Sequence, residues 1–249
     1  MKLFISFSKK AGVAAFWLIV WEAFARFVNN QFILVGPIEA FGRLFELALT
    51  WDFWTSIQFS ITRVVVGFLL SMLGGVLLAV VCSVSRIANA LIAPAVNVIK
   101  SVPVASFALL LVIFLNPNHV SVVISFVTVL PIIFFNTYKG IQSTDKNLLE
   151  MAQVFRLGFF RKVRHIYVPS TAPFVTSAAE SGLGFAWKAA ITGEIISLAT
   201  REGIGGSMQT ARAWLLTADL WAWTIAIIIL SFLMEKLIFA LLRRVKKWQ

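Results

Sequence analysis

Charged side chains are scarce in this chain of 249 residues: 13% are Asp, Glu, Lys or Arg, whereas 59% are hydrophobic. A soluble domain carries about 25% charged residues, because its surface must be solvated. The composition therefore excludes a soluble globule and indicates an all-α, polytopic membrane protein. A helix needs about 20 residues to cross a bilayer, so six would take roughly 120. We expect one transmembrane domain over 1–249, with no separate catalytic domain.

Reactive side chains are equally few. The one cysteine, Cys82, lies in an apolar stretch, so it excludes an internal disulfide and is interpreted as a core residue. The two histidines, His119 and His165, are far apart in sequence, which argues against a metal site or proton relay. No nucleophile–base pair or pair of acids has an informative spacing. We therefore expect no catalytic residue, no metal and no resident cofactor.

A phosphate-binding loop is also absent, since no G-x-x-x-x-G-K-[ST] pattern occurs. The chain is therefore not expected to hydrolyse ATP by itself. A glycine-rich stretch at Gly203, Gly205 and Gly206 has no lysine after it. It has two interpretations, a flexible segment near an outer gate or an ordinary turn before the last helix.

Apolar side chains gather in six segments, which we predict to be transmembrane helices. They are 11–28, 57–84, 88–115, 119–138, 172–197 and 218–241. The mixed stretch 38–54 is too polar to span and is predicted to be an interfacial helix anchored by Trp51 and Trp54. The third segment is long and contains Pro94 and Pro103, so we predict a kinked or broken helix there.

The net charge of +11 comes from basic residues in the short polar segments between apolar runs, which argues against nucleic-acid binding. Loops on one side hold Lys2, Lys9, Lys10, Arg86, Lys139, Lys146, Arg156, Arg161, Lys162, Arg164, Arg243, Arg244, Lys246 and Lys247. Loops on the other side hold Arg43, Arg201 and Arg212. The positive-inside rule therefore predicts that both termini are cytoplasmic.

The longest cytoplasmic loop, about 139–171, contains apolar residues at helical spacing. They are Leu148, Leu149, Ala152 and Phe155. The spacing predicts a short amphipathic helix from Asp145 to Phe155, broken by Gly158 and followed by a basic piece that runs to Pro169. Such a hairpin could be a docking element for a partner, or a solvated loop that only fixes topology.

Ionisable residues inside spans are costly and are functional candidates by default. Glu180, Lys188 and Glu194 lie in one segment and, at about 100° per residue, are predicted to share a broad face. This face could line a translocation pathway, with Lys100 as a further candidate. Alternatively, Lys188 could pair with a glutamate as an internal brace.

Other charges in spans are interpreted as structural: Glu22 with Arg26 as an i, i+4 pair, Arg63 as a brace, and Glu235 and Lys236 as snorkelling residues. The second span also repeats small residues every fourth position, which allows another helix to approach closely. They are Gly67, Ser71, Gly75, Ala79 and Ser83. Packing within the chain is the favoured interpretation, and a dimer seam is the alternative.

The long loop resembles the cytoplasmic signature of ABC importer permeases, which reads E-A-A, three residues, G, nine residues, I-x-L-P. Glu150 and Pro169 stand at the separation of that signature, and Ala152 and Ile166 fall on their positions. Val168 replaces its leucine and Met151 replaces its first alanine. Arg156 stands at its glycine, with Gly158 two residues later.

Three further stretches, within about 55–240, resemble the nitrate/sulfonate/taurine branch of these permeases. They are Arg63 with Gly67, Gly74 and Gly75, then Ser101–Pro103, then Gly184–Lys188 with Glu194. The resemblance implies the type I permease fold, with a coupling helix that contacts a cytoplasmic ATPase. The coupling residues it implies are Glu150, Met151, Ala152, Phe155, Arg156, Leu157, Gly158, Phe159 and Pro169.

The resemblance also implies a permease of the bacterial inner membrane that works as a homodimer. Its partners would be two ATPase subunits, which bind the ATP, and an external solute-binding protein. The solute would be a small anion such as a sulfonate, taurine or nitrate, or a vitamin-precursor nutrient. The alternative is an ion-coupled secondary transporter, a class that commonly has inverted repeats, of which the two halves of this chain show no convincing example.

Overall fold

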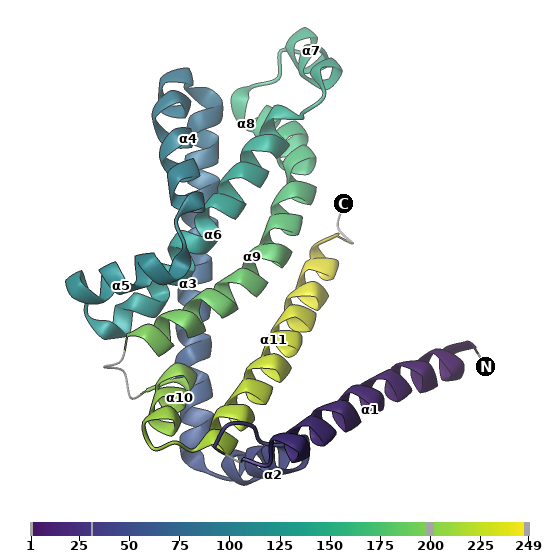
Figure 1. The fold of residues 1–249 in the computed structure, drawn as a ribbon. Helices are drawn as coiled ribbons and strands as arrows, with labels where there is room; N and C mark the ends of the chain where they lie inside the picture. Colours follow the sequence, from purple (N-terminus) through teal and green to yellow (C-terminus); the bar gives the residue numbers. More distant parts are fainter. Residues whose placement is uncertain (1, 31, 198–201, 247–249) are drawn as a thin grey trace.

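The computed structural model describes residues 2–30, 32–197 and 202–246, without the side chains of 2–11, 14 and 238–246. The described residues are almost entirely helical (Figure 1). The helices are α1 (Lys2–Val28), α2 (Pro37–Ala48), α3 (Trp51–Val84), α4 (Arg86–Ser101), α5 (Val104–Phe114), α6 (Pro117–Gln142), α7 (Lys146–Val154), α8 (Phe159–Lys162), a π-helical turn η1 (Val163–Tyr167), α9 (Val168–Ile196), α10 (Ile204–Ala213) and α11 (Thr217–Lys246). Arg201 and the basic residues near the two termini lie outside the described side chains.

The core of the molecule is made by α3, α6 and α9, in which α6 packs against both α3 and α9 more extensively than any other two described helices pack together. Small residues allow the close approach of α3 to α6. A Cβ atom on Gly67 would lie 2.8 Å from the Val122 carbonyl oxygen, and the Ser71 hydroxyl donates to the Phe126 carbonyl at 3.0 Å. The favoured interpretation of the small-residue repeat, packing within the chain, is therefore confirmed.

Three described helices are long and apolar enough to cross a membrane: Trp51–Val84, Pro117–Gln142 and Thr217–Leu237. The pair α4 and α5, bent by 102°, forms either a fourth broken span or a re-entrant loop. The fifth predicted span corresponds to α9, which is long but more polar than these. It packs inside the bundle against α3 and α6, so it does not need an apolar surface all round.

The predicted break in the third segment is confirmed at Pro103, the residue that precedes α5. Pro94, by contrast, lies inside α4 without ending it. The predicted interfacial helix 38–54 was too long, because α2 ends at Ala48 and Thr50 caps α3 by accepting from the Phe53 amide at 3.4 Å. The two tryptophans predicted to anchor that helix therefore lie in the first turn of α3.

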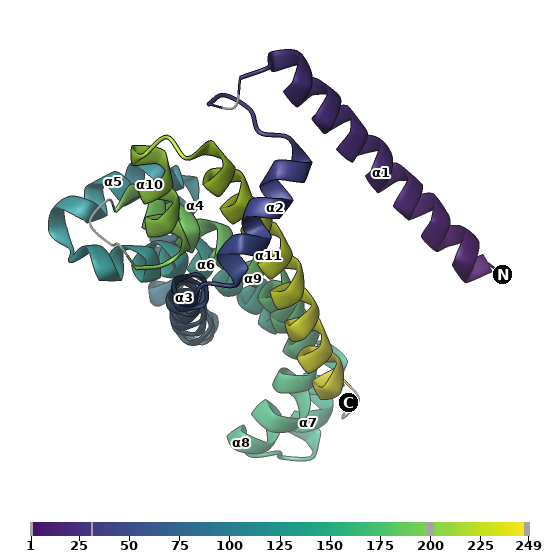
Figure 2. The same ribbon diagram turned by 90° about the horizontal axis from the view of Figure 1, so that it is seen from below.

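The N-terminal helix α1 stands away from the bundle (Figure 2). Near its C-terminal end, the Trp21 indole donates to the Val35 carbonyl at 3.1 Å, and the predicted Glu22–Arg26 pair is confirmed at 2.8 Å. Helix α2 is held to α11 by the ion pair of Arg43 with Asp219. The hydrogen bond to Asp219 raises the pKa of the Arg43 guanidinium further above its already high usual value.

Candidate functional site

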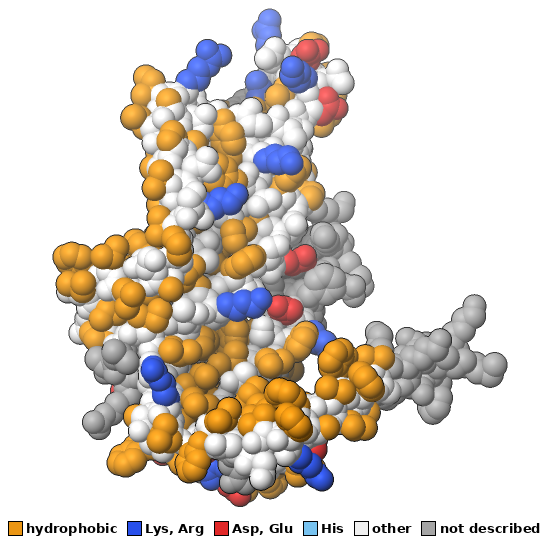
Figure 3. Space-filling view, viewed as in Figure 1, with side chains coloured by type: hydrophobic (Ala, Val, Ile, Leu, Met, Phe, Trp, Pro, Cys, Tyr) orange, Lys and Arg blue, Asp and Glu red, His pale blue; other side chains and the backbone are white. Residues whose placement is uncertain are grey.

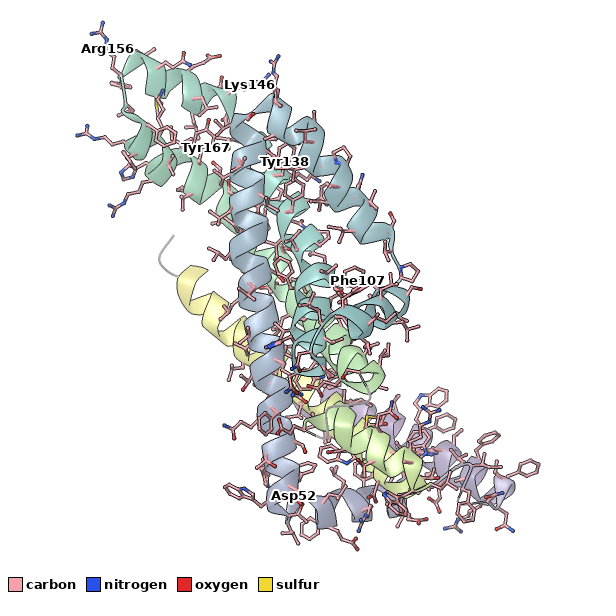
Figure 4. The ribbon with its side chains drawn as sticks, turned by 90° about the vertical axis from the view of Figure 1, so that its left-hand side faces the viewer. Asp52, Phe107, Tyr138, Lys146, Arg156 and Tyr167 are labelled. Carbon is pink, nitrogen blue, oxygen red and sulfur yellow. The ribbon has the colours of Figure 1, made fainter. Side chains whose placement is uncertain are left out.

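The loop between α6 and α9 forms a helical hairpin at the end of the molecule opposite α2 and α10 (Figure 1). Helix α7 spans Lys146–Val154, and the Asp145 carboxylate caps it by accepting from the Asn147 amide at 2.9 Å. The predicted amphipathic helix is therefore confirmed. Figure 4 shows Lys146 and Arg156 at this extremity, with Asp52 at the other end of α3.

The turn after α7 lies at Arg156, which adopts a left-handed conformation with φ of 49°. The Leu157 amide donates to the Ala152 carbonyl at 2.9 Å, and the Arg156 amide donates to the Gln153 carbonyl at 2.9 Å. This pair of bonds is the Schellman motif, in which glycine usually occupies the left-handed position. Arg156 thus occupies the left-handed position of the turn, at the place where the signature has its glycine.

Gly158 does not break the helix, so that prediction was wrong. Its φ is −65°, it serves as the N-cap of α8, and a Cβ atom there would meet nothing within 4 Å. The chain then remains helical from Phe159 to Ile196 through the π-helical turn η1. Pro169 consequently lies in the first turn of α9 rather than at the end of a separate basic piece.

The hairpin exposes a large apolar surface. Ala152 is fully buried, but the bulky side chains around it are exposed, with Phe160 at 85%. They are Leu148, Met151, Val154, Phe155, Phe159 and Phe160. Of the predicted coupling residues, Glu150 and Arg156 are also exposed. An exposed patch of this kind marks a surface that contacts another protein or a membrane.

At the opposite end of the bundle, Arg63 of α3 and Glu194 of α9 form a buried ion pair at 3.1 Å. The Glu194 side chain is 1% exposed, and its other oxygen accepts from the Ser60 hydroxyl at 2.7 Å and the Gly205 amide at 3.0 Å. Arg63 also donates to the Glu202 carbonyl at 3.0 Å. The predicted bracing role of Arg63 is confirmed.

The glycine-rich stretch packs directly on this ion pair. Gly203 has a φ of 99°, and a Cβ atom there would lie 2.8 Å from both Arg63 Nη1 and Glu194 Oε2. A Cβ atom on Gly205 would lie 2.3 Å from Glu194 Cβ. The glycines therefore begin α10 against a charged pair, which neither interpretation from the sequence anticipated.

Glu194 and Lys188 lie at the two edges of the predicted broad face, and the structure gives them different surroundings. Six residues at about 100° each place the two side chains about 120° apart around α9. Glu194 is buried, Lys188 is exposed, and Glu180 is half-buried. Among the described residues neither Lys188 nor Glu180 forms an ion pair, so the structure assigns the internal brace to Arg63 instead.

A charged side chain of α11 contacts α9 at Gly184, four residues before Lys188. Glu235 of α11 contacts α9, since a Cβ atom on Gly184 would lie 3.3 Å from its Oε1 atom. Figure 3 shows basic and acidic side chains on the surface over α9 and α11, in an otherwise apolar middle region. Lys100 is exposed elsewhere, on α4, with its Nζ atom 5.6 Å from the centroid of the Phe135 ring.

Comparison with known proteins matches residues 71–247 to the family described as binding-protein-dependent transport system inner membrane component. The putative aliphatic sulfonates transport permease of Bacillus subtilis (strain 168) is 23% identical over 93% of this chain and 84% of its own length. The nitrate import permease of Synechococcus elongatus is 26% identical over 72% of this chain and 68% of its own length. A crystal structure of an amino acid ABC transporter with histidines is similar in fold, with a TM-score of 0.61, 16% identity, and coverage of 78% of this chain and 92% of that one.

Proposed function

The chain belongs to the family of binding-protein-dependent transport system inner membrane components, and from this premise we propose that a separate cytoplasmic ATPase drives it through the α7–α8 hairpin. It is the permease subunit of an ABC importer. The observation that carries the proposal is the exposed apolar surface of the hairpin. A Schellman turn, at the position where the family signature has its glycine, fixes the end of α7 in this hairpin.

Burial of this surface in a partner is favourable at about 25 cal/mol per Å² of apolar area removed from water. Phe155, Phe159 and Phe160 are each at least 70% exposed, so they supply most of the area available for docking. Three basic residues on α8 and η1, Arg161, Lys162 and Arg164, steer the hairpin towards an acidic rim on the ATPase.

The assembly proposed around this hairpin has two copies of the chain, two ATPase subunits and an external solute-binding protein, in a bacterial inner membrane. The basic hairpin and both termini lie on the cytoplasmic side. Helices α2 and α10, at the opposite end of the bundle, then face the outside. ATP is bound by the ATPase and not by this chain, since its sequence contains no phosphate-binding loop.

The translocation pathway is proposed to run along the charged surface over α9 and α11, which includes Lys188, Glu180 and Glu235. An unpaired lysine in the middle of a span costs about 2.5–3.5 kcal/mol if it faces hydrocarbon. Contact with water or with a second copy avoids that cost. Lys100 is the weaker candidate, because its charge lies near the face of an aromatic ring outside this surface. A lysine in the pathway suits a small anion, and the named relatives carry sulfonates and nitrate.

The test is reconstitution into liposomes with the cognate ATPase and binding protein. Glu150→Ala and deletion of Leu157–Phe160 should abolish substrate-stimulated ATP hydrolysis and transport while the chain remains inserted. Glu39→Ala, which changes an exposed glutamate on α2, is the matched control and should leave both activities unchanged. Wild-type coupling in both loop variants would overturn the docking role. Uptake driven by an ion gradient without any ATPase would favour the secondary transporter instead.

A further inference from the structure

One continuous helical path joins the docking hairpin to the buried ion pair. It begins at Phe159, passes through η1, and continues along α9 to Glu194, close to the last residue of that helix. Figure 1 shows α9 running from the α7–α8 end of the bundle to the α10 end. The hairpin and the buried ion pair are therefore connected through helical backbone without an intervening loop.

The contacts at the end of this path bind three helices together. The Glu194 carboxylate takes hydrogen bonds from Arg63 and Ser60 of α3 and from Gly205 of α10. The Ile204 amide at the start of α10 donates to the Ser60 hydroxyl at 2.9 Å. Separating α10 from α9 would remove the Gly205 donor from a carboxylate that is 1% exposed, and separating α10 from α3 would remove the bond of Ile204 to Ser60.

We propose that Arg63 and Glu194 are positioning residues that lock α3, α9 and α10 into one rigid body, so that α10 moves together with the docking hairpin during transport. This proposal rests on the proposed function of the hairpin. The joint stays closed through the transport cycle, since the Glu194 carboxylate accepts from both α3 and α10 only in the closed arrangement. Gly203 and Gly205 support this assignment, because any side chain there would overlap the ion pair.

The first test replaces Glu194 by Gln, which keeps the size of the side chain but removes its charge. The variant is made in a Cys82→Ala background and reconstituted with the ATPase and binding protein. Solute transported per ATP hydrolysed should fall about 10-fold, a coupling loss within the range seen for single residues. Asp219→Asn, which removes the ion pair between α2 and α11 at the same end, is the matched control and should change this ratio less than about 2-fold.

The second test replaces the ion pair by a covalent link. The hydroxyls of Ser56 on α3 and Ser207 on α10 lie 3.0 Å apart, so cysteines at both positions are within reach of a disulfide. Oxidation of this pair should leave transport unchanged in a chain with native Glu194. In the Glu194→Gln chain, oxidation should restore the transport-to-ATP ratio, and reduction should abolish it again.

Loss of transport on oxidation of the chain with native Glu194 would overturn the proposal, because it would show that α10 must leave α3 in each cycle. A normal ratio in the Glu194→Gln chain would overturn it as well. The cross-link in the native background remains decisive if the Glu194→Gln chain does not assemble. Failure of the proposed function has a different signature, since the loop variants would then transport normally whatever the state of the joint.

Discussion

Replacement of Gly75 in α3 by alanine should destabilise the protein relative to the same replacement at its neighbour Gly74. A Cβ atom on Gly75 would lie 2.8 Å from Ile133 Cβ and 3.1 Å from the Phe134 backbone nitrogen. A Cβ atom on Gly74 would make ordinary contacts, 3.5 Å from Leu130 Cδ1 and from an atom of the Phe126 ring. The two variants therefore differ in whether α6 must move.

The comparison isolates this steric effect. An alanine gains about 1 kcal/mol over a glycine in the interior of a helix, and adjacent positions of α3 share that gain. Overpacking a close helix contact costs about 1–3 kcal/mol. Gly74→Ala should therefore stabilise the protein by up to about 1 kcal/mol. Gly75→Ala should be less stable than Gly74→Ala by about 1–3 kcal/mol.

The free energy of unfolding can be measured by titration with sodium dodecyl sulfate in mixed micelles, followed by the fluorescence of the nine tryptophans. Each variant is compared with the unmodified chain at the same detergent composition. If Gly75→Ala proved as stable as Gly74→Ala, the close contact of α3 with α6 would not be the reason for the small residues in this stripe.

Three other outcomes are expected. Arg156→Gly should stabilise the hairpin by roughly 1 kcal/mol, because a non-glycine residue in the left-handed conformation is strained, while Gly158→Ala should be tolerated. Thermal unfolding of both variants measures this, and a less stable Arg156→Gly chain would contradict the Schellman turn. Cys82 is 3% exposed and should react with a small maleimide only after unfolding, whereas Val84→Cys in a Cys82→Ala chain, at a position 80% exposed, should react in the folded state. Lys188→Cys in the Cys82→Ala background should be labelled by water-soluble reagents in the assembled transporter, and labelling by lipid-phase reagents alone would refute its place in the pathway.

The amphipathic hairpin helix illustrates what local sequence predicts well. Its apolar spacing and the capping residue Asp145 are properties of neighbouring residues, and α7 forms where they predict it. The sequence predicts the break at Gly158, since glycine is a common helix terminator. The Schellman bonds instead fix the left-handed residue by its distance from the last helical turn, so Arg156 occupies it.

The sequence by itself determined that this chain is a helical membrane protein with an amphipathic helix in its longest polar loop and no phosphate-binding sequence pattern, because hydropathy and motif spacing need no tertiary contact to be interpreted. It also showed Arg63 and Glu194 as opposite charges in apolar spans. Only the tertiary structure decided that these two form a pair, since they are 131 positions apart. A buried charge is stabilised by whichever partner the packing of α3, α9 and α10 brings within hydrogen-bonding distance, and helical periodicity within α9 alone does not contain that information.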